Sequence, residues 1–144
     1  MTRNPREVFL ALVNGVADAR WDDLPELYAE RTHVVHPFDP LRAAPLLTRD
    51  DLRAHFARAA ALRQGVRREP TNITIHETTD PEVIVAEFEY RSTIDGVVSL
   101  LPCIFVLRVR DGQIVESRDY VDHLSSARAL GRLDHLVSAL RSGS

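Results

Sequence analysis

One segment decides the fold: residues 111–122 read DGQIVESRDYVD. Its Asp111-Gly112 pair is flanked by alternating apolar residues, a pattern typical of a tight β-hairpin turn. After the turn, one face of the predicted strand consists of Val115, Ser117, Asp119 and Val121. Burying a carboxylate on such a face is costly without a partner. Asp119 therefore lies either at an edge that solvent reaches or in a cavity, where it is available for chemistry.

Upstream of this hairpin, helical patterns come first and β-type patterns follow. Asn4, Pro5 and Glu7 predict the start of a first helix, and Thr48 with Asp51 predicts the start of another. Between them we expect a short helix capped by Asp22, a β segment over 32–38 and an irregular connection over 39–45. Strands are predicted at 72–79, 82–94, 98–110 and 113–124, before a last helix capped by Ser125 or Ser126.

Helices first and hairpin strands afterwards predict an α+β fold. We expect a curved mixed or antiparallel sheet wrapped around the N-terminal helices, with an added C-terminal helix. A length of 144 residues suits one hydrophobic core, so a single domain over 1–144 is predicted. A ligand pocket is expected between the concave side of the sheet and the helices.

The pattern of the strands also predicts which side chains face outward. On strand 82–94 the apolar face should meet the helices, which places Glu87 and Glu89 outside, in a charge ladder with Arg108 and Arg118. Catalysis by Glu87 would require a bulge that turns it inward. Residues 100–107 are apolar on both faces. We therefore expect the outer face to be covered by a second copy, giving a homodimer through the sheet.

Composition narrows the chemistry. All 18 basic residues are Arg, so Schiff-base chemistry on a lysine is excluded, and proton transfer falls to His, Asp, Glu, Tyr or Cys. No cofactor is expected. The net charge is −3 without a long basic tract, so no nucleic-acid partner is expected, and the arginines between Arg63 and Arg68 are interpreted as a solvated loop.

The single cysteine and the absence of long apolar runs bear on the compartment. Cys103 has no partner for an internal disulfide, which suits a reducing environment, and its apolar strand predicts a buried, inert thiol. No apolar run approaches membrane-spanning length, and the start of the sequence has no signal-peptide core. We expect a cytoplasmic protein without a membrane partner.

The six histidines differ in their suitability as metal ligands and as bases. His33 and His36 are three residues apart on a strand and face opposite sides, so no metal site is expected. His36 ends a strand beside Pro37, where imidazole either has a structural role or takes a proton near neutral pH. The others are expected at the surface, at a cap or partly buried at the pocket rim: His55, His76, His123 and His135.

Three stretches resemble one family. DGQIVESRDYVD resembles the last hairpin of the nuclear-transport-factor-2-like α+β cone, in its SnoaL-like branch. Residues 28–38 resemble a strand that ends in Asp-Pro in ketosteroid isomerases, and residues 80–87 resemble the opening of the third strand in SnoaL-like chains. Polyketide cyclases, limonene epoxide hydrolases and phenazine-biosynthesis proteins share this cone, which hosts many chemistries and also non-enzymes.

The resemblance implies roles for two residues. Asp119 matches the general acid/base of the cyclases and epoxide hydrolases, and His36 stands where the isomerases keep their base. The oxyanion-binding tyrosine of the isomerases is replaced by Leu12, and their second acid falls on an apolar stretch near residues 103–105. The third-strand polar residues of the hydrolases also match apolar ones. Steroid isomerisation is therefore not expected, and the hydrolase triad looks incomplete.

These observations predict a SnoaL-like protein that binds a hydrophobic small molecule. We favour a cofactor-independent acid/base enzyme of the cyclase or isomerase type, with Asp119 and His36 as catalytic residues. The alternative is a non-catalytic ligand-binding or dimerisation module. An inward Asp119 within reach of His36 or a tyrosine would favour the enzyme, and a collapsed cone would favour the module. Binding residues are expected among the aromatic ones: Trp21, Tyr28, Phe56, Phe88, Tyr90 and Phe105.

Overall fold

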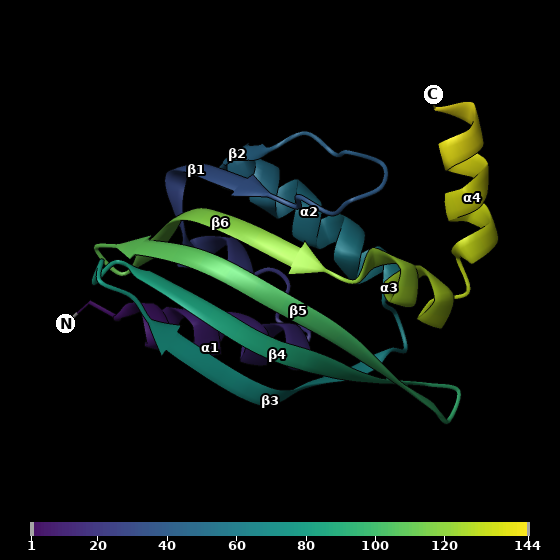
Figure 1. Ribbon diagram of the computed structural model, residues 1–144, viewed down its shortest axis with the longest axis horizontal. Coiled ribbons are helices and arrows are strands. Elements are labelled where there is room, and N and C mark those ends of the chain that lie inside the picture. Colours follow the sequence, from purple (N-terminus) through teal and green to yellow (C-terminus); the bar gives the residue numbers. More distant parts are fainter. Residues whose placement is uncertain (1, 144) are drawn as a thin grey trace.

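The computed structural model describes residues 2–143 and is shown in Figure 1. The helices are α1 (Pro5–Ala17), α2 (Arg49–Leu62), α3 (His123–Ala129) and α4 (Leu133–Ser142), with a 3₁₀ turn η1 (Leu24–Leu27). The strands are β1 (Tyr28–Val35), β2 (Leu46–Thr48), β3 (Arg67–Glu77), β4 (Val83–Ile94), β5 (Val97–Arg110) and β6 (Gln113–Val121). Within this range, no helix is both long and apolar enough to cross a membrane.

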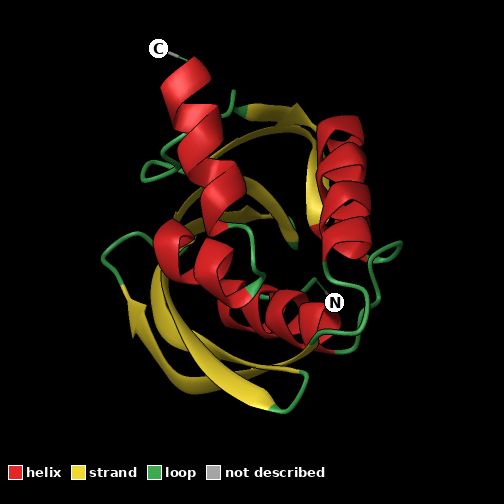
Figure 2. Ribbon diagram, turned by 90° about the vertical axis from the view of Figure 1, so that its right-hand side faces the viewer, coloured by secondary structure: helices red, strands yellow, loops and turns green. Residues whose placement is uncertain are grey.

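All the strands belong to one sheet in the order β2-β1-β6-β5-β4-β3. The pair β1–β6 is parallel, and every other neighbouring pair is antiparallel. Viewed from the end at which α3 and α4 lie, the sheet curves around the helices (Figure 2). Helix α1 contacts β3, β4 and β5, whereas α2 contacts β1 and β2. The predicted α+β fold with a curved mixed sheet is confirmed.

The core forms where α1 meets the concave face of the sheet. Asn4 and Glu7 form the predicted capping box, which fixes the start of α1 and the direction of its apolar face. Phe9 is fully buried on this face, with its ring centroid 5.2 Å from that of Phe88 and 6.3 Å from that of Phe105. The edge-on packing of the three rings fills the middle of the cone.

Several element boundaries differ from the sequence prediction. Asp23 rather than Asp22 precedes η1, without a side-chain cap, and Tyr28 already belongs to β1. Strand β3 begins at Arg67, five residues earlier than predicted, because the arginine-rich segment pairs with the end of β4.

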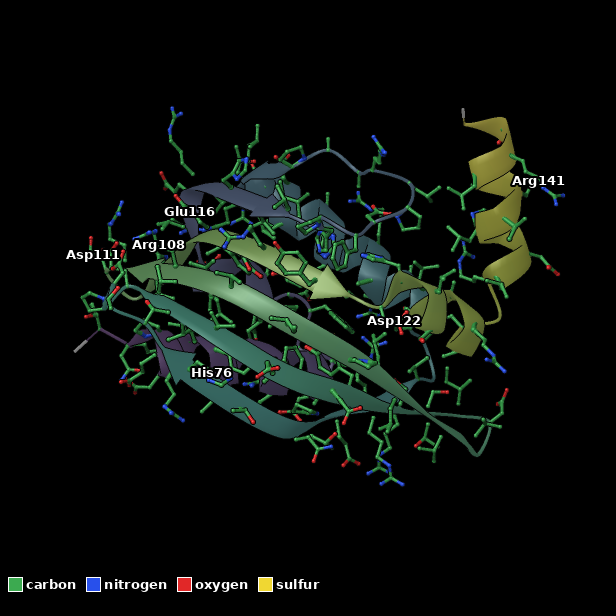
Figure 3. All side chains as sticks on the ribbon, in the orientation of Figure 1. His76, Arg108, Asp111, Glu116, Asp122 and Arg141 are labelled. Carbon is green, nitrogen blue, oxygen red and sulfur yellow. The ribbon has the colours of Figure 1, made fainter. Side chains whose placement is uncertain are left out.

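The C-terminal region contains two helices where one was predicted. Asp122, labelled in Figure 3, caps α3 by accepting a hydrogen bond from the Ser125 amide at 3.0 Å, so β6 ends at Val121 and neither serine is the cap. Gly131 separates α3 from α4 with a φ of 68°, which a side-chain-bearing residue rarely adopts. The break lets α4 leave the line of α3 (Figure 1).

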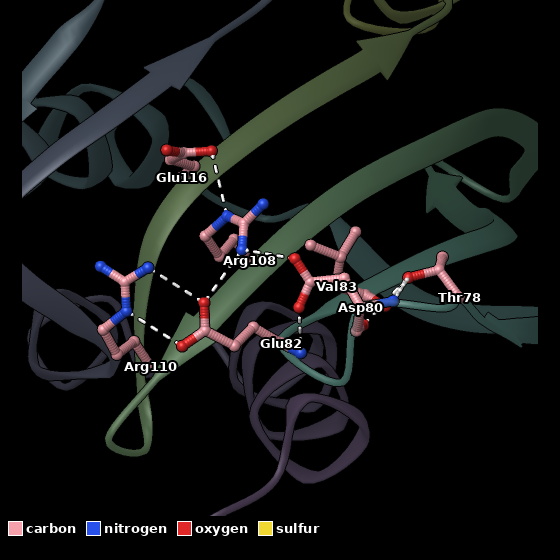
Figure 4. Close-up of polar contacts among 7 residues, drawn as sticks. All are labelled: Thr78, Asp80, Glu82, Val83, Arg108, Arg110 and Glu116. Atoms are coloured by element: carbon pink, nitrogen blue, oxygen red, sulfur yellow. Dashed lines mark hydrogen bonds and ion pairs between the residues drawn. The ribbon is translucent and has the colours of Figure 1, made fainter.

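The predicted outer face is confirmed, but its ion pairs differ from those expected. Arg108 lies 2.9 Å from carboxylate oxygens of both Asp80 and Glu82 and 3.4 Å from that of Glu116 (Figure 4). Arg110 forms an ion pair with the same Glu82 carboxylate at 2.9 Å. The glutamates placed opposite Arg108 by the strand pattern have other partners: Glu87 contacts His76 and Glu89 accepts from Asn72, each at 2.6 Å. Their nearest partners lie on β3, the next strand in the sheet.

We predict that Phe9→Ala destabilises the protein by about 3–5 kcal/mol, because it leaves a cavity among three packed rings. Guanidinium unfolding followed by circular dichroism measures the change. Phe38→Ala is the matched control, since Phe38 is 68% exposed and its loss should change stability by less than about 0.5 kcal/mol. Equal stabilities for the two variants would contradict this packing.

Candidate functional site

The site centres on Asp119, which lies on the inner face of β6 and is 7% exposed. Ser117, two residues earlier on the same face, donates a short hydrogen bond from Oγ to Oδ1 of Asp119. The other carboxylate oxygen, Oδ2, is 3.7 Å from Nε2 of His36. Of the two positions that the sequence left open, the structure has the buried one, with a hydroxyl and an imidazole as neighbours.

Burial controls the ionisation of Asp119. Loss of water around the carboxylate raises the pKa of Asp119 above the ordinary aspartate value, while His36 and then the Ser117 hydroxyl act in the opposite direction. A raised pKa brings an acid closer to the range in which it both takes and returns protons near neutral pH. The direction agrees with that predicted from the apolar neighbours of Asp119 on its strand.

The parallel pairing of β1 with β6 brings His36 to Asp119. Val35 pairs with Arg118, so the next residues along the two strands, His36 and Asp119, are neighbours. His36 is two residues after Val34 and therefore points to the same side of the strand. Val34 is 1% exposed and faces the core. The sequence pattern therefore placed His36 at the right end of its strand, and the structure joins the two predicted catalytic residues.

A second imidazole, that of His55, lies beside His36 with 5.4 Å between the ring centroids. Burial lowers the pKa of His55 to about 4, with further contributions from His36, Arg58 and Arg63. His55 is therefore neutral at pH 7. His55 was expected beside the inner face of its helix, partly buried at the pocket rim, and its position three residues after the buried Leu52 puts it on the inner side of α2.

His123 also turns toward the site, which corrects its expected position at the surface or at a cap. Its ring centroid is 6.3 Å from that of His36, and its Nε2 is buried without a hydrogen-bond partner among the described residues. Burial lowers the pKa of His123. The shift follows from the early end of β6, which makes His123 the first residue of α3. Within residues 2–143 no group of three or more His, Cys, Asp or Glu is arranged to hold a metal ion.

The aromatic residues predicted to bind substrate fall into two groups. Trp21, Tyr28 and Phe56 lie next to the histidines: the Phe56 ring is 6.5 Å from Trp21, 6.0 Å from Tyr28 and 5.2 Å from His55. Burial, and then Asp119, raises the pKa of Tyr28 well above 10, so its hydroxyl stays protonated. Phe88, Phe105 and Tyr90 line the inner face of β4 and β5, where the two phenylalanines pack on Phe9.

The arginine segment is not the solvated loop that the sequence suggested. Arg68 is 6% exposed, and its guanidinium carbon lies 4.9 Å from the centroid of the Tyr90 ring. Arg63 is the C-cap residue of α2, and its guanidinium carbon is 6.0 Å from the Trp21 ring. Arg68 turns inward because it pairs with Ser92, a buried residue of β4.

Cys103 is confirmed as a buried thiol. It is 4% exposed, and burial raises its pKa to about 12, which keeps the sulfur protonated. It lies on the inner face of β5 between Phe88 of β4 and Val121 of β6, and its Sγ is 3.6 Å from the Leu101 carbonyl oxygen.

The SnoaL-like domain matches this chain over residues 9–117. The chain belongs to the SnoaL-like family. The matched range holds α1, α2, the strand that leads to His36 and the hairpin of β4 and β5, and it ends two residues before Asp119. The match to the SnoaL-like family therefore does not include the Asp119 carboxylate.

An uncharacterized PhzA/B-like protein of Pseudomonas aeruginosa is 36% identical to this SnoaL-like chain over 66 residues. The match covers 44% of this chain and 47% of that protein, so the chain aligns with about half the length of this curated relative.

Solved structures share the fold over most of its length. A Bacillus subtilis protein provisionally named an isomerase superposes with a TM-score of 0.75 and 21% identity, covering 88% of this chain and 92% of its own. A Xanthomonas campestris protein provisionally named a polyketide cyclase superposes with a TM-score of 0.67 and 16% identity, covering 85% of this chain and 93% of its own. A protein with a ketosteroid isomerase-like fold from Catenulispora acidiphila, solved with trimethylamine, superposes with a TM-score of 0.68 and 21% identity. The match covers 90% of this chain and 95% of that protein. At these identities the likeness establishes the SnoaL-like cone.

We predict that His55 makes the protein less stable in mild acid. The folded pKa of about 4 lies below the ordinary histidine value of about 6.5, so between these pH values the unfolded chain binds the extra proton. Stability is therefore lost as the pH falls from 6.5 toward 4. His55→Gln should reduce the loss between pH 7 and pH 5 by about 2 kcal/mol, as measured by urea unfolding.

The matched control is His135→Gln, because His135 is exposed on α4. An acid response that is the same in His55→Gln and in the control would show that His55 is not the buried neutral imidazole described above.

Proposed function

We propose that this protein is a cofactor-independent acid/base enzyme of the cyclase or isomerase type, acting on a hydrophobic small molecule. The observation that carries the proposal is the buried Asp119 carboxylate with His36 at 3.7 Å. A carboxylate of raised pKa beside an imidazole, among aromatic side chains, is suited to moving a proton at an activated carbon.

In the proposed mechanism Asp119 takes a proton from a carbon next to a carbonyl group. The C–H bond breaks, its electron pair forms the enolate, and the proton passes to the carboxylate. His36 or Tyr28 donates a hydrogen bond to the developing oxyanion, and the raised pKa of Tyr28 supports the second choice because that hydroxyl keeps its proton. Asp119 then returns its proton at the position that completes the cyclisation or isomerisation. Ser117 holds Oδ1 in place throughout.

The alternative is a non-catalytic module that binds a ligand or a second copy. Its support is the packing of Phe9 against Phe88 and Phe105, which fills the middle of the cone. The same core leaves Asp119 buried, and a carboxylate held there costs stability that a purely structural domain has no use for. For this reason we favour the enzyme.

We predict that Asp119→Asn abolishes turnover while the protein still folds. The first step is to incubate the protein with cell extract and to identify retained molecules by native mass spectrometry. Deuterium incorporation from D₂O into each retained carbonyl compound, followed by NMR, then reports proton abstraction. Loss of the base should lower this rate by at least about 100-fold.

The matched control is Glu87→Gln, because Glu87 is an exposed carboxylate on the neighbouring outer face. It should exchange deuterium at the wild-type rate. Asp119→Asn should also be more stable than wild type at pH 7, since a folded pKa above the unfolded value means that stability falls as the pH rises from about 4 toward the folded pKa. Wild-type exchange in Asp119→Asn would leave the ligand-binding module as the function.

We also propose a homodimer through the sheet. The outer faces of β3 to β6, together with α3 and α4, border a groove of about 920 Å³. Apolar side chains are exposed beside it, including Ile104 at 41% and Leu140 at 42%. Helix α4 stands away from the sheet (Figure 1) and exposes Leu133 and Val137 on the same side as Leu140. A second copy would cover both apolar surfaces.

We predict a dimer of 16.2 kDa chains at micromolar concentration and a monomer for Ile104→Glu, because a buried unpaired carboxylate would oppose association. Light scattering coupled to size-exclusion chromatography measures both. Ala57→Glu, which adds the same charge to an exposed position of α2, is the control and should remain a dimer. A wild-type mass of one chain would refute the dimer.

A further inference from the structure

Among the described residues, the buried Arg68 and the half-buried Arg63 lack a counter-charge. Most arginines with a close partner in this protein are on its surface, such as Arg53 with Asp50 and Arg108 with Glu82. Among residues 2–143, neither Arg63 nor Arg68 lies within ion-pair distance of a carboxylate, and Nε of Arg68 is buried with no hydrogen-bond partner.

Such a charge is costly to keep. Arginine stays protonated in proteins, and a buried guanidinium without an anion loses its hydration with little in return. The Tyr90 ring at 4.9 Å returns part of that loss through a cation–π contact. Arg63 adds to the cost, because its pKa is lowered to about 10 by burial and then by repulsion from Arg68. An anion between the two arginines would remove both penalties.

The protein itself does not supply that anion within the described residues. Asp119 is the one acid among the buried side chains, and Ser117 and His36 already contact its two oxygens. The register places Asp119 on β6 and Arg68 on β3, with β5 and β4 between them. Three strand spacings amount to about 14 Å across the sheet. The two residues are also offset along it, because Asp119 aligns through Phe105 with Ala86 whereas Arg68 pairs with Ser92, six residues further along β4. Both side chains lie on the inner face.

We propose that Arg68, assisted by Arg63, binds a carboxylate of the substrate. The inference rests on the proposed function and adds to it: the substrate has an apolar body, a carboxylate at the arginine end and an activated carbon at Asp119. The planar guanidinium fork matches a carboxylate with two parallel hydrogen bonds. The aromatic rings of Tyr90 and Trp21, which contact the two guanidinium groups, would flank the body of the ligand beside its charged end.

The test uses two probes of nearly equal shape that differ in charge, 1-adamantanecarboxylate and 1-adamantanecarboxamide. Binding is followed by fluorescence of Trp21, the single tryptophan of the chain, which lies 6.0 Å from the guanidinium carbon of Arg63. Wild type should bind the carboxylate at least tenfold more tightly than the carboxamide. Arg68→Gln should bring the two affinities within twofold, and Arg63→Gln should reduce the preference partly.

Arg118→Gln is the matched control, since Arg118 is exposed on the outer face of β6, and it should keep the wild-type preference. Three results would each overturn the proposal. Wild type could bind the two probes equally, or the preference could survive in Arg68→Gln. Wild type could also bind neither probe at concentrations up to 10-fold above the one at which free tryptophan itself responds.

Thermal unfolding without probe keeps the proposal testable if Arg68→Gln folds poorly. Arg68→Met retains the apolar stem and removes the unpaired charge, so its melting temperature should equal or exceed that of wild type. The carboxylate should raise the melting temperature of wild type and not that of Arg68→Met. A purely structural Arg68 would give the reverse, a large drop in Arg68→Met with equal effects of the probe on both proteins.

The result is separable from the test of the proposed function. Asp119→Asn removes the base and leaves both arginines, so it should keep the carboxylate preference. An inactive Asp119→Asn together with no carboxylate preference in wild type would retain the acid/base function and reject the anionic substrate.

Discussion

The parallel ladder between β1 and β6 is the constraint on which the rest of the site depends. Every other pairing joins strands that run in opposite directions. This one joins the N-terminal part of the chain, with β2 and α2, to the long antiparallel strands. Because both strands run the same way, their ends coincide, and His36 and Asp119 meet although they are far apart in the sequence. A shift of one residue would turn one of them to the other face.

Around this pair, the interior is organised by the cost of buried charge. An imidazole and a hydroxyl limit the rise in the pKa of Asp119, whereas His55 is kept neutral by burial and by its cationic neighbours. The two arginines lie next to aromatic rings, Arg63 by Trp21 and Arg68 by Tyr90, and Arg63 is also one of the cationic groups that lower the pKa of His55. Among residues 2–143, neither arginine forms an ion pair with Asp119, whose partner is His36 at 3.7 Å.

Local signals in the sequence were sufficient for much of this architecture. The capping boxes at Asn4 and Thr48 and the Asp111-Gly112 turn each act over a few residues, and all three are where the sequence placed them. The alternation of side chains along β4 and β6 correctly placed Glu87 on the outer face of the sheet and Asp119 on the inner face. Arg68 and His123 were missed because their positions depend on where a neighbouring element ends. Arg68 turns inward only once β3 extends back to pair with β4, and His123 does so only because β6 stops at Val121.

Alternation along β6 has a mechanical consequence as well. Asp119 faces the interior, and the next residue, Tyr120, borders the outer groove, where Phe38 packs on it at 5.1 Å. On β5 the neighbours Cys103 and Ile104 divide in the same way. The strands are therefore a partition one peptide layer thick, with the two surfaces of the protein on opposite sides. Any twist of β6 imposed at Tyr120 is transmitted to the Asp119 carboxylate through a single peptide bond, with no intervening side chain to absorb it.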